Sequence, residues 1–251
     1  MTPPRELREV PAVHGDFPCH ELAAWAANFG VVAGITNRGA DFGLSSTEPT
    51  NAVLDRWRRL RMAMRPGFGS VAVAHQCHGT ALKTHQASGS EWRVDVDIDG
   101  HLTNEPGLLL GVTVADCVPV YLVQEAGPWL GLLHAGWRGI AAGIVECGIA
   151  RLCELAVCAP SDVAIHCGVS ICDSCYEVGP EVYQALTGES PAGRRQLDLK
   201  AVLVHRARRS GISRVTVSPW CTAHDRGTFY SHRGSGGMDG RMVAYLGRAS
   251  P

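Results

Sequence analysis

Three short runs of this chain combine residue types that bind metal ions. They are Gln76-Cys77-His78-Gly79, Ala115-Asp116-Cys117 and His134-Ala135-Gly136-Trp137-Arg138-Gly139. His78 and His134 offer imidazole nitrogens and Cys117 offers a thiolate, all of which zinc accepts as ligands. Two imidazoles and one thiolate leave the fourth position of a tetrahedral zinc ion open to water or substrate, as in catalytic zinc sites. These residue types therefore predict a catalytic metal centre.

Each of these residues also has an ordinary alternative role. A single histidine is more often a hydrogen-bonded side chain than a ligand, and a single cysteine more often a small buried hydrophobe. Asp116 would orient an imidazole, receive a proton, or cap a turn. A fourth protein ligand, such as His75, Cys77 or His224, would close the site and leave the metal with a purely structural role.

The elements around these runs predict how they are positioned. Short apolar runs bounded by glycine or proline are typical of buried strands, and they lie at residues 31–35, 70–74, 108–114, 118–123, 129–133, 163–165 and 215–217. Helical spacing of apolar residues predicts helices at 51–64, 140–157, 180–186 and 198–209. The predicted fold class is α/β (mixed α+β), with a central mixed sheet flanked by helices. We expect a flexible N-terminal arm over residues 1–15 and a single catalytic domain over residues 16–251.

Composition narrows the class of partner. The formal charge of -1 and the pI of about 6.8 provide no basic surface for nucleic acid or an anionic membrane, so a small-molecule substrate is expected. No apolar stretch reaches the roughly 18 residues of a membrane span, and the first residues lack the apolar core of a signal peptide. A cytoplasmic protein whose ten cysteines are mostly thiols is therefore expected.

Five motifs together resemble those of the laccase-domain family, whose members are called polyphenol oxidases or purine nucleoside phosphorylases. In chain order the motifs cover residues 76–79, 113–120, 134–139, 175–179 and 229–233, and the likeness runs from about Arg38 to Ala244. The resemblance implies a single α/β domain and a zinc ion held by His78, Cys117 and His134. It also implies phosphorolysis of adenosine, inosine and methylthioadenosine to a free base and a pentose 1-phosphate, with deamination of adenosine as a second activity.

The same motifs suggest further site residues. Asp116 and Arg233 are expected to be catalytic, and substrate contacts are expected from Arg38, Asp99, Arg138 and Tyr176. Phosphorolysis needs a bound anion, and a guanidinium binds phosphate in a bidentate manner, so Arg38, Arg138 and Arg233 are all candidates. Deamination would follow from a zinc ion with an open position, which lowers the pKa of water to about 7.

Departures from the family pattern fall outside the three predicted ligands. The segment Asn37 to Gly43 is shortened and altered, and Cys221-Thr222-Ala223-His224 stands where relatives have Cys-Thr-x-Cys. The Cys172-x-x-Cys175 spacing suits a redox pair or half of a zinc site, but no second Cys-x-x-Cys follows, so a loop lining the pocket is expected.

Other functions use the same ligands. A copper-dependent polyphenol oxidase would need further histidines, and no His-x-His pair occurs, although copper would bind this donor set more tightly than zinc. An amidase that edits peptidoglycan precursors would use the same metal-activated water. In a non-enzymatic protein the metal would only hold loops together.

Overall fold

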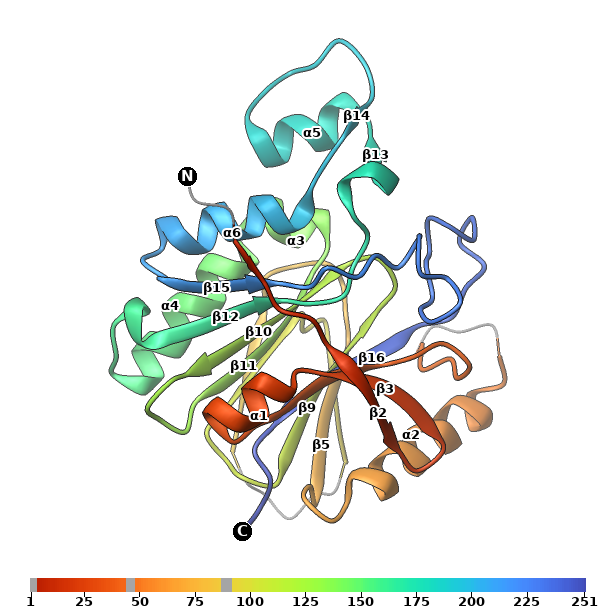
Figure 1. Cartoon of the computed structure of the whole chain (residues 1–251), viewed down its shortest axis with the longest axis vertical. Coiled ribbons are helices and arrows are strands. Elements are labelled where there is room, and N and C mark those ends of the chain that lie inside the picture. The colour runs from red at the N-terminus through yellow and green to blue at the C-terminus, as the bar shows by residue number, and fades with distance from the viewer. Residues whose placement is uncertain (1–3, 44–47, 87–91) are drawn as a thin grey trace.

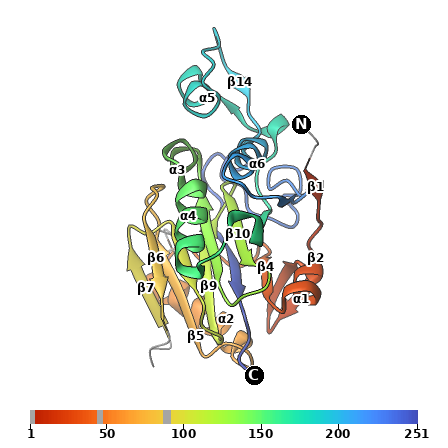
Figure 2. The same cartoon turned by 90° about the vertical axis from the view of Figure 1, so that its left-hand side faces the viewer.

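Two seven-stranded mixed sheets lie face to face in the computed structural model, which describes residues 4–43, 48–86 and 92–251 (Figure 1). Helices cover the outer faces of this sandwich, as the side view shows (Figure 2). The predicted mixed α and β class is confirmed. The strands divide between two sheets, however, where the sequence predicts one central sheet.

The first sheet carries most of the helices. In spatial order its strands are β1 (Arg5–Glu6), β15 (Arg214–Val217), β12 (Val163–Cys167), β10 (Val118–Gln124), β11 (Leu130–Ala135), β8 (Gly100–Thr103) and β6 (Leu82–His85). Its outer face packs against α3 (Trp137–Ala142), α4 (Ile144–Ala156) and α6 (Leu199–Arg209).

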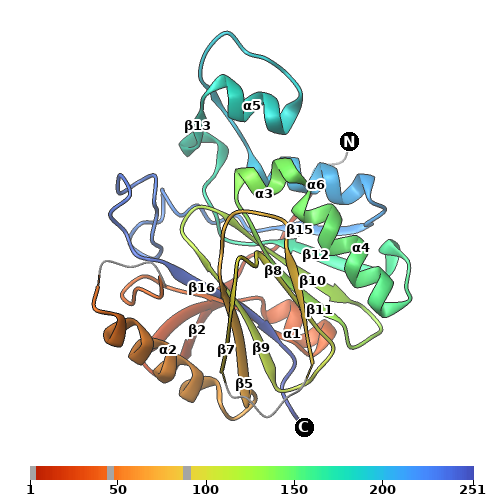
Figure 3. The ribbon, with the colours of Figure 1, turned by 180° about the vertical axis from the view of Figure 1, so that it is seen from behind.

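The second sheet is covered by one long helix. Its strands are β2 (Val10–His14), β3 (Phe17–Glu21), β4 (Val32–Thr36), β16 (Met242–Gly247), β9 (Leu108–Val114), β5 (Ser70–His75) and β7 (Trp92–Val96). Helix α2 (Thr50–Met64) buries Trp57, Leu60 and Met64 against the outer face of this sheet. The short helix α1 (Ala23–Phe29) contacts β4. Figure 3 shows β7 and β8 on the opposite side of the molecule from the view of Figure 1.

The continuous apolar runs of the sequence are explained by burial on both faces of a strand. In β10, Val120 and Leu122 pack toward the helices, whereas Tyr121 and Val123 pack toward the second sheet. Side chains alternate between the faces of a strand, so a strand in the middle of four layers needs apolar residues at every position. The cores lie between each sheet and its helices and between the two sheets.

The predicted helix over 140–157 is divided in two. Gly143 has a φ of 95°, in the left-handed region, and separates α3 from α4. Helix α5 (Pro180–Thr187) and the small pair β13 (Glu177–Val178) and β14 (Arg195–Gln196) project from the body of the molecule (Figure 1). Short 3₁₀ turns lie at Pro160–Asp162 and Asp173–Cys175.

The N-terminal segment takes part in both sheets, where the sequence predicts a flexible arm. Strand β1 pairs in parallel with β15, and β2 pairs with β3, while residues 1–3 of the predicted arm lie outside the described residues. The buried Glu9 carboxylate accepts hydrogen bonds from Ser218 Oγ at 2.7 Å and His166 Nε2 at 3.0 Å. These contacts tie the segment to the first sheet.

Within the described part of the chain, no helix has the length and apolar character needed to span a membrane.

Candidate metal centre

His78, Cys117 and His134 form a compact cluster, as their residue types predict. Their candidate ligand atoms all lie within 4.8 Å of one another. Cys117 Sγ is 3.9 Å from His78 Nε2, and the two imidazole ring centroids are 4.8 Å apart. His78 is exposed and His134 is buried, so the cluster opens to solvent on the His78 side.

The topology of the sandwich explains why these residues meet. Residues 76–81 lead from β5 in the second sheet to β6 in the first, and residues 115–117 lead from β9 to β10 in the same way. Strands β5 and β9 run parallel, so both crossings leave the second sheet at the same edge. His134 lies near the end of β11, opposite Pro119 at the start of β10. Two crossings and one strand end thus bring the three side chains together.

Asp99 organises the cluster from behind. Its carboxylate accepts hydrogen bonds from the backbone N–H groups of Cys77 at 3.1 Å, His78 at 3.0 Å and Gly79 at 2.7 Å. It also lies 2.8 Å from His134 Nδ1, which turns the Nε2 atom of that imidazole away from Asp99. A carboxylate on the far nitrogen is the usual arrangement behind a metal-binding histidine.

Charges within the cluster favour the ionised forms of Cys117, Asp99 and His134, so a metal ion bound here would displace the second proton of the His134 imidazole. Burial raises the pKa of the Cys117 thiol, but the neighbouring His134 and His78 imidazoles outweigh burial and lower this pKa to about 6. Burial lowers the pKa of His134, but Cys117 and Asp99 outweigh it and raise that pKa to about 9. Burial raises the pKa of Asp99, whereas hydrogen bonds, first from His134 and then from Gly79, bring it down to about 2. Cys117 is therefore held as a thiolate, the form in which cysteine binds metals.

The backbone around the cluster is shaped for close approach. A Cβ atom on Gly136 would lie 2.7 Å from His78 Cδ2 and 3.1 Å from Cys117 Sγ, so only glycine leaves room for both side chains. His78 itself has a φ of 61°, in the left-handed region that non-glycine residues adopt uncommonly and that recurs at functional sites. One thiolate, two imidazoles and this close approach fit a borderline-soft ion such as zinc or copper.

A cavity of about 530 Å³ adjoins the cluster, within the usual size range of small-molecule sites. His78, Cys117, His134 and Arg138 all line it. The Arg138 guanidinium lies over the Trp137 ring, with its Cζ atom 4.5 Å from the ring centroid. A Cβ atom on Gly139 would lie 2.9 Å from Gly79 O, so glycine at this position lets helix α3 approach the crossing that carries His78.

Asp116 lies beside the cluster and has three hydrogen-bond donors around its carboxylate. Thr222 Oγ1 at 2.6 Å and Ser231 Oγ at 2.7 Å donate to Oδ1, and the Arg233 backbone N–H donates to Oδ2 at 2.6 Å. Asp116 has a φ of 82° and is buried. Its carboxylate holds residues 222–233 against the crossing that carries Cys117.

Only some of the other predicted site residues line the cavity. Arg138 lines the cavity described above, whereas Arg38, Arg233, Asp99 and Tyr176 do not. Arg38 donates to Arg226 O and lies over the Tyr230 ring. Asp99 has no exposed surface and lies behind the cluster, and its expected contact with substrate stays a prediction.

Arg233 and Tyr176 form a pair of their own. The Arg233 side chain donates to Glu177 O at 2.7 Å, and its guanidinium carbon lies 4.9 Å from the centre of the Tyr176 ring. Burial, followed by the nearby Cys117 charge, raises the pKa of Tyr176 to about 12. Only the backbone N–H of Arg233 contacts Asp116.

Several cavity residues were not predicted from the sequence. Gln76 forms a bridge to β9: its Oε1 accepts from Thr113 N at 2.7 Å, and its Nε2 donates to Thr113 O at 2.9 Å. Gln76 belongs to the same short run as His78, so the sequence did contain a sign that Gln76 lies at the site. The remaining unpredicted polar residues along the cavity are Asp41, His232, Asp239 and Arg241, and His75, one of the candidate fourth ligands, also lines it.

Comparisons with known proteins find relatives in both sequence and fold. Residues 26–249 match the family described as multi-copper polyphenol oxidoreductase laccase. The chain is 31% identical over 248 residues to the purine nucleoside phosphorylase YlmD of Geobacillus stearothermophilus, which covers 87% of this chain and 90% of that one. It is 29% identical over 164 residues to the adenosine deaminase RL5 of an unknown prokaryotic organism, with 60% and 62% covered.

A solved structure is similar in fold over nearly the whole chain. The crystal structure of YlmD from Geobacillus stearothermophilus superposes with a TM-score of 0.86 at 27% identity, covering 96% of this chain and 100% of that one. The matched region contains His78, Cys117 and His134. The chain therefore belongs to the multi-copper polyphenol oxidoreductase laccase family.

Proposed function

We propose that this protein is a zinc-dependent purine nucleoside phosphorylase whose catalytic domain includes strands β1 and β2, ahead of the expected boundary at residue 16. Its substrates would be adenosine, inosine and methylthioadenosine, and its products a free base and a pentose 1-phosphate. The observation that carries the proposal is the cluster of His78, Cys117 and His134 in the wall of a cavity that Arg138 also lines. The names of the relatives, purine nucleoside phosphorylase among them, support purine nucleosides as the class of substrate.

His78, Cys117 and His134 would hold the zinc ion. When bound there, zinc would supply Lewis-acid polarisation to a substrate or water in the cavity. The protein itself keeps Cys117 ionised and fixes His134 through Asp99. Asp116 contributes by holding the segment 222–233 in place through three hydrogen bonds, and not through a contact with the cavity.

Of the three candidate arginines, Arg138 is the one best placed to bind phosphate. Of the three arginine candidates, it alone lines the described cavity, while Arg233 is engaged with Glu177 O and Arg38 with Arg226 O. In phosphorolysis, a phosphate oxygen forms a bond to C1′ of the ribose as the bond from C1′ to the purine nitrogen breaks, and the base takes up a proton. A guanidinium that holds the phosphate in line would lower the cost of positioning it.

The decisive experiment supplies inosine to the zinc-loaded protein with and without inorganic phosphate. We expect hypoxanthine and ribose 1-phosphate only when phosphate is present, and no turnover by Cys117→Ser. Cys147→Ser, an exposed cysteine on α4, is the matched control and should keep wild-type activity. Inosine left intact by zinc-loaded protein with phosphate would contradict the proposal.

Deamination of adenosine is proposed as a second activity of the same site, because one relative is named adenosine deaminase. It should release ammonia and inosine from adenosine with or without phosphate. Its loss in Cys117→Ser, in parallel with phosphorolysis, would be expected if both reactions use one metal. Ammonia release that persists in that variant would separate the deamination from this site.

The family description itself suggests a copper-dependent oxidase. This alternative predicts oxygen-dependent oxidation of a phenol by copper-loaded protein at rates far above those of the free ion. We expect the zinc form to be the active one on nucleosides. Phenol oxidation without any nucleoside turnover would favour the oxidase.

A further inference from the structure

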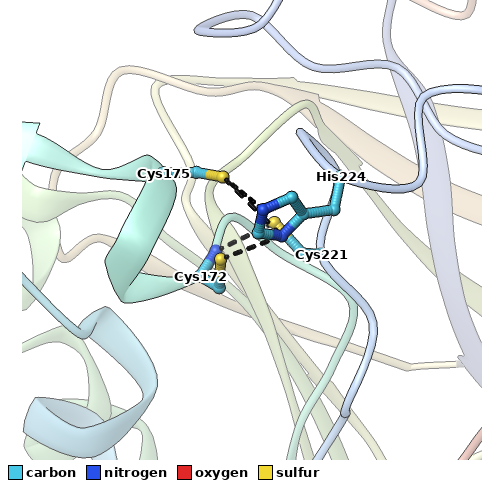
Figure 4. A group of neighbouring side chains, drawn as sticks. All are labelled: Cys172, Cys175, Cys221 and His224. Carbon is cyan, nitrogen blue, oxygen red and sulfur yellow. Dashed lines mark hydrogen bonds between the residues drawn. The ribbon is translucent and has the colours of Figure 1, made fainter.

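A second group of metal-binding side chains lies outside the cavity described above. It consists of Cys172, Cys175, Cys221 and His224, whose candidate ligand atoms all lie within 4.8 Å of one another. Figure 4 shows the four side chains pointing toward a common centre from two separate segments of the chain. Cys172 and Cys175 belong to the loop after β12, and Cys221 and His224 to the loop after β15. None of the four lines the cavity.

The spacing between these atoms suits one shared ion. With Zn–S about 2.3 Å and Zn–N about 2.0–2.1 Å, tetrahedral geometry puts a sulfur and a nitrogen ligand roughly 3.6 Å apart. His224 Nδ1 is 3.5 Å from Cys172 Sγ and 3.7 Å from Cys175 Sγ. All ten cysteines are free in the structure, so no disulfide competes for these thiols.

The backbone already holds the four residues in place. Cys175 N donates to Cys172 O at 3.2 Å, closing the turn that brings the two thiols to one side. The Cys172 N–H points at Cys221 Sγ at 3.3 Å, a contact typical of the groups surrounding a metal-bound thiolate. Asp225 Oδ2 accepts from Cys221 N at 3.0 Å and fixes the turn that leads to His224. Ser170 and Cys221 form a parallel bridge between the two loops.

We propose that these four residues form a second, structural zinc site. Three thiolates and one imidazole complete a tetrahedral coordination sphere and leave no position for substrate, as in closed structural zinc sites. The Cys172-x-x-Cys175 pair has its missing partner in Cys221-x-x-His224, which has the same spacing.

The second zinc site would stabilise the loops that contact Asp116. Ile171, next to Cys172, donates its N–H to Asp116 O at 3.1 Å, and Thr222, next to Cys221, donates its hydroxyl to Asp116 Oδ1 at 2.6 Å. A metal ion that joins the two loops would therefore fix Ile171 and Thr222, which both donate hydrogen bonds to Asp116, the residue that precedes Cys117. The second site would hold the wall of the first without taking part in its chemistry.

Counting metal ions tests the proposal directly. Wild-type protein purified with zinc and without oxidant should contain about two zinc ions per chain. Cys175→Ser and His224→Ala should each contain about one, as should Cys117→Ser, while the exposed Cys147→Ser control keeps about two. His224→Cys preserves a zinc ligand and should restore the second ion. An identical zinc content in wild type, Cys175→Ser and His224→Ala would overturn the proposal.

Cobalt provides a readout that does not depend on activity or on a surviving variant of the second site. Cys117→Ser loaded with Co²⁺ should show the intense visible bands of a tetrahedral thiolate-rich site, together with sulfur-to-cobalt charge transfer. Absence of these bands in cobalt-loaded Cys117→Ser would contradict a second site. A Cys172–Cys175 disulfide in the freshly isolated protein, seen as an intact mass about 2 Da lower with no metal at these residues, would replace it with a redox pair.

Discussion

Asp99 joins the two histidine-bearing segments of the cavity wall through a single carboxylate. Its Oδ2 accepts from the N–H groups of Cys77 and Gly79, and its Oδ1 faces His78 N and His134 Nδ1. Asp99→Asn would turn an NH₂ group toward these donors on one side. We expect the affinity for zinc at the cavity to fall by about 10–100-fold, as for other partners of metal-binding histidines.

Competition with a metal chelator would measure this affinity. Asp97→Asn, on an exposed side chain two residues away, serves as the control and should bind zinc as tightly as wild type. Wild-type affinity in Asp99→Asn would remove Asp99 from the support of the site.

Gly136 is a second residue whose effect depends on distance alone. Gly136→Ala would bring a methyl group to 2.7 Å from His78 Cδ2, so the imidazole has to move. Such overpacking costs about 1–3 kcal/mol, and about 1.4 kcal/mol is a tenfold change in affinity. Zinc binding at the cavity should therefore weaken by roughly tenfold or more, with little change in circular dichroism. Gly193→Ala, with nothing within 4 Å of its Cβ, should leave metal binding unchanged.

Arg138 separates phosphate binding from metal binding at the level of one side chain. Arg138→Ala should raise KM for phosphate by about 10–100-fold, since a hydrogen bond to a charged group contributes about 1.5–3 kcal/mol. Zinc content should stay the same. Arg138→Lys should fall between the two because it keeps the charge but loses the bidentate geometry. The exposed Arg151→Ala on α4 is the control, and an unchanged phosphate KM in Arg138→Ala would reassign the phosphate site.

At the scale of elements, β6 and β8 bury two histidines against each other. His85 Nε2 lies 2.9 Å from His101 Nδ1, a hydrogen bond between two neutral rings. Burial lowers the pKa of His85 to about 4 and that of His101 to about 3. In the unfolded chain both would titrate near about 6.5. As pH falls from about 6.5 to 4, the unfolded chain takes up protons that the folded protein does not, so stability is lost.

The resulting slope is measurable by denaturant unfolding at a series of pH values. Each such histidine should lower the free energy of unfolding by roughly 1.4 kcal/mol per pH unit within this window. His101→Gln should therefore show a shallower acid slope than wild type. His205→Gln, an exposed position on α6, should retain the wild-type slope. Equal slopes in all three proteins would contradict this account of the pair.

The elements also differ in how well the sequence predicts them. Strand β9 was predicted with its observed bounds, and α2 was predicted within one residue, because apolar periodicity there matches burial. Edge strands such as β6 and β7 carry Lys83, Arg93 and Asp95, which hide the pattern. Strand β16 is a fully buried run that the sequence contained and the prediction left out. Residues 5–14 form strands through partners more than 200 positions away in one case, which local sequence cannot reveal.

The sequence likewise predicts some residues of the candidate sites and not others. The spacing of His78, Cys117 and His134 pointed to a common centre, and the structure brings these residues together. The role of Asp99 depends on its complete burial behind them, which no motif encodes. The second cluster does not follow from the sequence pattern, because the usual partner of Cys172-x-x-Cys175 is another Cys-x-x-Cys pair. Its partner in the structure is instead Cys221-x-x-His224, about 50 residues further on.

For the whole molecule, the core between the two sheets joins the two halves that together carry the cavity. Leu132 on β11 is completely buried there. Leu132→Ala should lower the free energy of unfolding by about 2–5 kcal/mol, as for other large-to-small core changes. Leu54→Ala, on the exposed side of α2, should change it by less than about 0.5 kcal/mol. Denaturant unfolding of both variants measures the difference, and a small loss in Leu132→Ala would show that the sheets are supported elsewhere.

The two crossings between the sheets have a consequence for how the protein assembles itself. Because His78 and Cys117 stand on links between the sheets, the three ligands can meet only after the two sheets have docked. Metal capture during refolding should then report a late event, with a rate set by docking and not by zinc concentration. Closing contacts between distant segments is the slow part of folding for sheet-rich chains. Stopped-flow refolding of His224→Ala, which lacks the second zinc site, followed by a zinc-sensitive dye would time that step.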